Sequence, residues 1–81
     1  MKIKQFHAKN QFVVSDDHGN RFLQSYDSII VKIDKEGKTS LGENWDYSKT
    51  TGKYRNLYLG ETKKETEAKI KSGEYKLDET L

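Results

Sequence analysis

The spacing of the apolar residues changes near Asp46, and this change limits the folds that the chain can adopt. Before this point apolar residues alternate with polar ones, as on β-strands, and after it they recur every three or four positions, as on helices. The strongest strand pattern places Ile29, Val31 and Ile33 on one face. β-Branched residues at these positions favour a strand. The sequence therefore predicts an α+β fold in which a sheet precedes the helices.

Turn residues divide the first half of the chain into strands. Residues 16–20 and 34–38 are rich in Asp, Gly and Asn, which favour tight turns. The expected strands are residues 11–15, 21–26, 29–34 and 39–45, and short further strands at residues 2–7 and 74–77 are left open. We predict a small antiparallel β-meander of three to five strands with one or two C-terminal helices packed on one face.

Two helices are expected in the second half. Ser48 is the expected N-cap of the first helix, which begins near Lys49, and Thr50 competes for this role. A threonine followed by a glutamate three residues later forms a capping-box pattern at the start of the second helix. Glycine favours the left-handed conformation that ends many helices. The second N-cap is Thr62, and the two terminating glycines are Gly60 and Gly73.

The length of 81 residues predicts a single domain, residues 1–81. We expect residues 1–46 to be β-rich, residues 47–73 to be helical and residues 74–81 to form a short strand or tail. A domain of this size has a small core, so a homo-oligomer is left open. The expected core residues are Phe12, Val14, Phe22, Tyr26, Ile29, Val31, Ile33, Leu41, Trp45, Tyr54, Leu57 and Tyr58.

Composition argues against several functional classes. No apolar run approaches the ~20 residues of a membrane span, so no membrane partner is expected. The first ten residues lack the apolar centre of a secretory leader. The chain contains no cysteine, which fits a reducing cytosol. We therefore expect a cytoplasmic protein.

Catalysis is not predicted. The chain has two histidines, His7 and His18, and no phosphate-binding glycine motif or nucleophile elbow. His18 follows two aspartates, which suggests a metal or acid–base site or, alternatively, the exposed tip of a hairpin. We favour the tip because nothing there excludes water. We expect no enzymatic activity, no cofactor and no metal.

Positive charge is concentrated in the helical half. Residues 47–71 hold seven basic and three acidic residues, although the whole chain has a net charge of +2. Such a face can meet an acidic surface on a protein, or it can hold phosphate groups at a helix N-terminus. The acidic residues of the second helix argue against plain DNA binding. The spacing of Tyr54, Leu57 and Tyr58 predicts a packed stripe on the first helix. The candidate partner-binding residues, expected outside this stripe, are Lys49, Lys53, Arg55, Lys63 and Lys64.

Three blocks of sequence carry a resemblance to a known family. They are Asn10-Gln11-Phe12, residues 24–30 (QSYDSII) and residues 45–54 (WDYSKTTGKY). Over residues 1–60 the chain resembles a family of small proteins from phages and mobile elements of Gram-positive bacteria. The resemblance implies no particular activity, but it does imply a phage accessory protein that acts in the host cytosol.

Two functions from different classes follow as expectations. The first is a phage accessory protein that binds a host protein, most plausibly inhibiting a host enzyme or a defence nuclease as an anti-CRISPR protein does. The alternative is a small nucleic-acid-binding regulator that uses the basic helical half.

Overall fold

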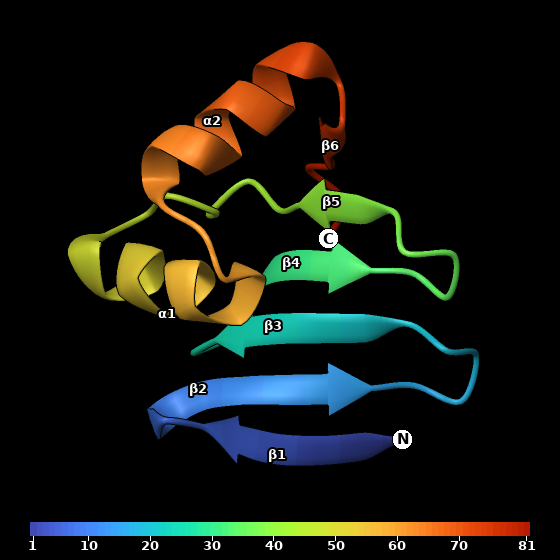
Figure 1. Cartoon of the computed structure of the whole chain (residues 1–81). Helices are drawn as coiled ribbons and strands as arrows, with labels where there is room; N and C mark the ends of the chain where they lie inside the picture. The colour runs from blue at the N-terminus through green and yellow to red at the C-terminus, as the bar shows by residue number, and fades with distance from the viewer.

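A computed structural model describes residues 1–81 as one six-stranded sheet with two helices (Figure 1). The elements are β1 (Lys2–Phe6), β2 (Ala8–Ser15), β3 (Arg21–Ser25), β4 (Ser28–Ile33), β5 (Thr39–Leu41), α1 (Lys49–Leu59), α2 (Lys63–Ser72) and β6 (Tyr75–Leu77). The strands lie in chain order across the sheet. The predicted α+β class is confirmed, and the sheet has more strands than the three to five expected.

The sheet is a five-stranded antiparallel meander extended by one parallel strand. β1 to β5 pair antiparallel with their neighbours, whereas β6 pairs parallel with β5. A parallel pair needs a long crossover connection, and both helices lie in this connection. The two helices therefore bring the end of the chain back to the edge of the sheet. Neither helix has the length and apolar character needed to cross a membrane.

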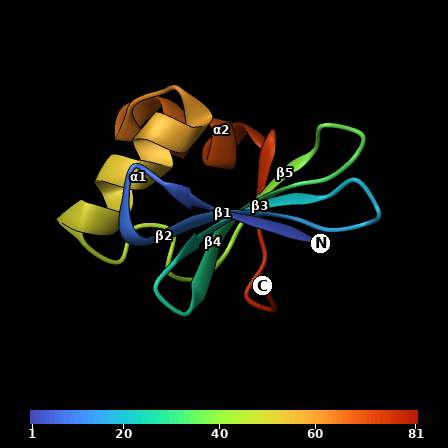
Figure 2. The same ribbon diagram turned by 90° about the horizontal axis from the view of Figure 1, so that it is seen from below.

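Both helices lie on the same side of the sheet, and the end of the chain after β6 lies on the other side (Figure 2). On the helix side, a row of apolar residues in register crosses four strands. Val13 pairs with Leu23, Leu23 with Val31, and Val31 with Leu41. Leu23, Val31 and Leu41 are at most 1% exposed. These three residues form the centre of the core, to which Ile30 and Tyr75 also belong.

The expected inward orientation of Phe12, Val14 and Phe22 is wrong. In β2 and β3 the neighbouring residues Val13 and Leu23 face the helices, so the alternation of a strand turns Phe12, Val14 and Phe22 to the opposite face. No helix covers that face (Figure 2), and these three side chains are only partly buried. Both faces of these strands are apolar in sequence, so the pattern alone did not show which face the helices cover.

A β-bulge explains why two consecutive residues of β4 are both buried. Leu23 pairs with Val31 and Gln24 with Ile29, so Ile30 is an extra residue on β4. Ile30 is 1% exposed, whereas Ile29, an expected core residue, is only partly buried. The chain passes so close here that a Cβ on Gly42 would lie 2.2 Å from the Ile29 carbonyl oxygen. Only glycine fits at that position.

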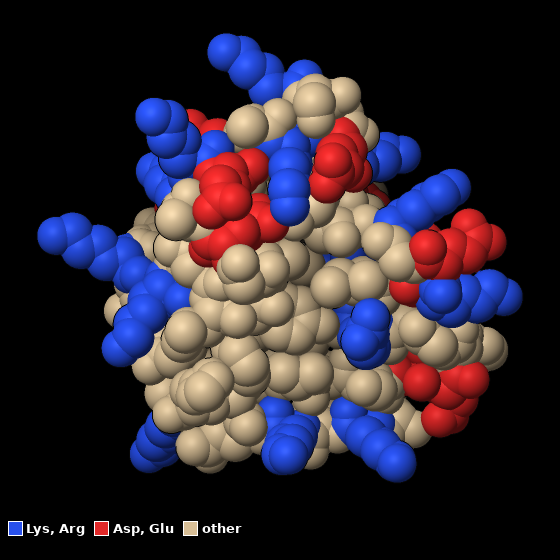
Figure 3. All heavy atoms as spheres, viewed as in Figure 1, with Lys and Arg blue, Asp and Glu red and all other residues tan.

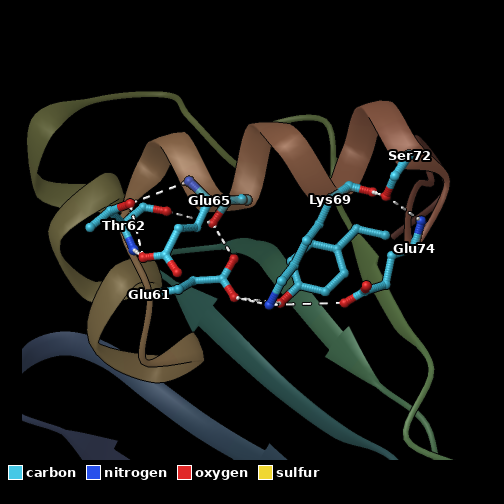
Figure 4. A network of polar contacts seen from close by, with 8 residues as sticks. Glu61, Thr62, Glu65, Lys69, Ser72 and Glu74 are labelled. Atoms are coloured by element: carbon cyan, nitrogen blue, oxygen red, sulfur yellow. Dashed lines mark hydrogen bonds and ion pairs between the residues drawn. The ribbon is translucent and has the colours of Figure 1, made fainter.

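Both predicted helix starts are confirmed. The Ser48 hydroxyl accepts a hydrogen bond from the Thr51 amide at 3.2 Å, so Ser48 rather than Thr50 caps α1. Thr62 and Glu65 form the capping box at the start of α2 (Figure 4). Gly60 and Gly73 end the two helices in the left-handed conformation, as predicted.

The helices contribute fewer apolar residues to the core than the sequence suggested. Leu57 is 50% exposed, so its expected burial is wrong. Trp45 and Tyr58 pack against the core while remaining partly exposed. Tyr54 is also partly buried. Because so few apolar side chains hold the helices, polar contacts become important for their positions.

One such contact is a buried carboxylate that joins α2 to β6. The side chain of Glu61 is 5% exposed. Its Oε1 accepts hydrogen bonds from Lys69 Nζ at 2.7 Å and from Tyr75 Oη at 2.8 Å, and its Oε2 accepts one from Thr66 Oγ1 at 2.6 Å (Figure 4). Glu61 therefore links the start of α2, its last turn and the edge strand.

These contacts favour the ionised carboxylate. Burial raises the pKa of Glu61, but the hydrogen bonds from Lys69, Thr66 and Tyr75 outweigh burial and hold this pKa below its ordinary value of 4.5. A carboxyl whose pKa is lowered in the folded state stabilises the fold above its unfolded pKa, and it loses this effect as the pH falls through its folded pKa.

We predict that Glu61→Gln lowers the free energy of unfolding at neutral pH by about 1–3 kcal/mol, the usual size for a lost charged hydrogen bond. The difference between variant and wild type should shrink as the pH falls below the ordinary carboxyl pKa of 4.5. Urea unfolding at several pH values measures both effects. Glu67→Gln, on an exposed position of α2, is the matched control and should change the stability by less than about 0.5 kcal/mol. Equal stability losses for the two variants at neutral pH would contradict the role of Glu61.

Candidate functional site

Four of the five predicted site residues lie around one hollow of about 650 Å³ beside the start of α1. No apolar side chain lines this hollow. Its basic residues are Lys49, Lys53, Arg55 and Lys63. Lys64 is exposed but does not line it. In the space-filling view, Lys and Arg side chains extend from the left margin, where α1 begins (Figure 3).

Arg55 differs from the other three because its side chain is buried. It is 1% exposed, so the expectation that it lies outside the packed stripe is wrong. Its Nη1 donates hydrogen bonds to the Trp45 carbonyl oxygen at 2.8 Å and to Asp46 Oδ1 at 3.2 Å, and its Nη2 donates to Asn56 Oδ1 at 3.0 Å. The guanidinium carbon also lies 5.1 Å from the centre of the Trp45 ring. Arg55 thus fixes α1 to the segment that precedes it.

Asp46 holds the two helix starts together. Its carboxylate contacts Arg55 Nη1 at 3.2 Å and Lys63 Nζ at 2.8 Å. The hydrogen bond from Lys63, supported by the one from Arg55, lowers the pKa of Asp46 although burial opposes this shift. The same carboxylate raises the pKa of Lys63. Asp46 neutralises part of the positive charge in the hollow. Lys49 and Lys53 therefore carry the positive charges of the hollow that are not paired with a carboxylate.

The start of α1 adds to this positive charge. The first amides of a helix have no partner within the helix and carry a partial positive charge. The first turn of α1 contains no acidic residue to offset it. We call Lys49, Lys53 and Lys63, together with this helix start, the basic surface. Its chemistry suits carboxylates or phosphates.

An apolar side chain lies in line with the lysines. Lys49, Lys53 and Leu57 are spaced four residues apart on α1, which places them on one side of the helix. All three are exposed, and Leu57 is 50% exposed. The sequence analysis missed Leu57 as a surface residue because its spacing with Tyr54 and Tyr58 equally suits a buried stripe.

A second hollow, of about 300 Å³, lies at the β3–β4 turn. Tyr26 and Tyr47 line it, and they are 59% and 78% exposed. The sequence analysis placed Tyr26 in the core, which is wrong. The strand alternation extends through Tyr26 in sequence, but the chain turns at this residue and its backbone φ is +54°.

The histidines lie apart from both hollows. His18 lies in the β2–β3 turn, where Asp16 Oδ1 accepts hydrogen bonds from the amides of His18 and Asn20. These two bonds, together with one from the Asn20 side chain, hold the pKa of Asp16 below its usual value. No group of three or more His, Cys, Asp or Glu side chains lies close enough together to hold a metal ion.

A model of a family of unknown function, DUF8033, matches residues 1–75. The chain belongs to the DUF8033 family. No curated protein and no solved structure matches the chain. Both hollows of this DUF8033 member lie within the matched residues.

We predict that Arg55→Lys lowers the free energy of unfolding by about 1.5–3 kcal/mol, because a lysine cannot reproduce the hydrogen bonds to Trp45, Asp46 and Asn56. Lys53→Gln, on the exposed side of α1, is the control and should cost less than about 0.5 kcal/mol. Thermal and urea unfolding of both variants measure this difference. An unchanged stability of Arg55→Lys would mean that the buried guanidinium does not hold α1 in place.

Proposed function

We propose that this protein is a phage or mobile-element accessory protein that acts in the host cytosol by binding a host protein. The target that we propose is a host enzyme or a defence nuclease, which the protein inhibits as an anti-CRISPR protein does. The phage setting rests on the resemblance of the three sequence blocks. The binding role rests on the basic surface.

The observation that carries the proposal is the exposed stripe of Lys49, Lys53 and Leu57 on α1. Protein interfaces combine an apolar centre with charged residues that select the partner. A phosphate backbone, in contrast, uses lysines but has no use for an exposed leucine beside them. The stripe therefore favours an acidic protein surface with an apolar contact next to it.

The alternative is a nucleic-acid-binding regulator, and one observation favours it. The start of α1, with its partial positive charge, lies beside Lys49, Lys53 and Lys63, which is an arrangement that can hold a phosphate group. Asp46 lies in the same hollow, however, and Glu65 and Glu67 are exposed on α2. These carboxylates would lie near the phosphates and weaken their binding.

We predict that the double variant Lys49→Glu, Lys53→Glu loses a host protein that the tagged wild-type chain captures from nuclease-treated host lysate. The matched control is Lys2→Glu, Lys4→Glu on β1, which makes the same change in net charge away from the basic surface. The control should retain the captured protein. Mass spectrometry of the bound material provides the readout, and the activity of the purified target with added protein then tests inhibition.

The variant Leu57→Ala distinguishes binding to a protein from binding to a nucleic acid. A protein interface should lose affinity about tenfold or more when this apolar contact is removed, whereas binding to phosphates should not change. Direct titration with duplex and single-stranded DNA at two salt concentrations completes the test. Micromolar DNA binding that weakens steeply with salt and survives Leu57→Ala would overturn the protein target and establish the alternative.

A further inference from the structure

The hollow between Tyr26 and Tyr47 has the properties of a preformed binding site. Tyr26 belongs to the turn between β3 and β4, whereas Tyr47 lies before α1, so two distant segments meet here. Asn44 Nδ2 donates a hydrogen bond to Ser28 Oγ at 3.0 Å and thereby ties the two segments together. The Tyr47 amide also donates to the Asn44 carbonyl oxygen at 3.1 Å. The walls of the hollow are therefore held in place in the free protein.

The backbone of Tyr26 is strained. β3 ends at Ser25 and β4 begins at Ser28, and these two residues pair, so Tyr26 and Asp27 form a two-residue hairpin turn. Only the first of them, Tyr26, has a positive φ, of +54°. Such turns strongly favour glycine at this first position, and a bulky residue there is an outlier.

Two hydrogen bonds hold the Tyr26 backbone in this conformation. The Tyr26 amide donates to the Asn10 carbonyl oxygen at 2.7 Å, and Gln24 Nε2 donates to the Tyr26 carbonyl oxygen at 2.7 Å. The fold gains little from the aromatic ring, because the side chain of Tyr26 is 59% exposed. A strained, exposed aromatic residue that is fixed on both sides is typical of a functional position.

The charge of the hollow indicates the kind of ligand. Asp27 is the only charged residue that lines it, and none of the ion pairs in the structure involves Asp27. A free carboxylate beside two exposed aromatic rings attracts a cation, which binds both by charge and by cation–π contact. A volume of about 300 Å³ is at the lower limit for ligand sites and suits a single side chain.

We propose that this hollow binds the guanidinium group of an arginine side chain on a partner protein. A guanidinium is planar, stacks on tyrosine rings and donates two parallel hydrogen bonds to a carboxylate such as Asp27. A lysine ammonium has neither the planar shape nor the paired donors. A nucleobase would also stack on the tyrosines, and the amino group of some bases could donate to Asp27, but a nucleotide would bring a phosphate toward this carboxylate. This site lies outside the basic surface and does not depend on the proposed function.

The test is a titration of the isotope-labelled full chain with a blocked glycine–arginine–glycine peptide, followed by NMR. We expect shift changes confined to the amides around Tyr26, Asp27 and Tyr47. The same peptide with citrulline, which has nearly the same shape but no charge, should bind about tenfold more weakly, as should the arginine peptide to Asp27→Asn. A parallel titration with uridine monophosphate tests whether the hollow binds a nucleobase instead.

Tyr26→Gly separates binding from folding. Because glycine suits the positive φ, this variant should unfold at the same temperature as the wild type or at a higher one, while its binding of the arginine peptide falls about three- to tenfold. Tyr47→Ala should weaken binding by a similar factor. The proposal is overturned if the arginine peptide causes no shift changes at the hollow, if citrulline binds equally well, or if uridine monophosphate binds more tightly. None of these results requires a host target, so they leave the proposed function unaffected.

Discussion

The buried guanidinium of Arg55 is the contact that fixes α1 to the chain segment that leaves the sheet. The fully buried apolar core has only five residues, and four of them come from β3, β4 and β5. The helices add only partly buried side chains to it. Arg55 joins α1 to the backbone of Trp45 and to Asp46, and Asp46 in turn contacts Lys63 at the start of α2. A small apolar core is thus supplemented by a few directional polar contacts.

Glu61 holds the end of the chain in place, as Arg55 holds α1. Its carboxylate is shielded from solvent and joins Lys69 and Thr66 of α2 to Tyr75 of β6. A buried charge destabilises a protein unless its hydrogen bonds are satisfied, and both of its oxygens have partners here. The parallel strand β6 is short, and this contact together with α2 holds it at the sheet edge. The sheet, the two helices and the last strand therefore form one interdependent unit.

The two hollows lie on either side of the start of α1 and have opposite charge. The basic surface lies around Lys49, Lys53 and Lys63, and the tyrosine hollow contains one free carboxylate, Asp27. A partner that presents an acidic patch next to an arginine would match both. Such a pairing of opposite charges gives an interface its orientation as well as its affinity. Either site alone would select a partner much less strictly.

The local elements of this protein are determined by its sequence. Ser48, Thr62, Gly60 and Gly73 delimit the helices through hydrogen bonds within a few residues, and the turns of the meander are equally local. The clustering of lysines at the start of α1 was also predictable, because neighbours on a helix follow from its period. Lys63 lies beside these lysines only because of its tertiary contact with Asp46.

Only the tertiary structure decided which side of each element is buried. β2 and β3 are apolar on both faces, and the side that the helices cover determined that Leu23 rather than Phe22 is fully buried. The burial of Arg55 and the exposure of Leu57 follow from how α1 packs on β3, β4 and the segment around Trp45, which no local pattern encodes. The tyrosine hollow arises where two segments about twenty residues apart in the chain meet, and the strained turn at Tyr26 has no signature in composition or period. Contacts within one element follow from the sequence, whereas contacts between elements depend on how the whole chain packs.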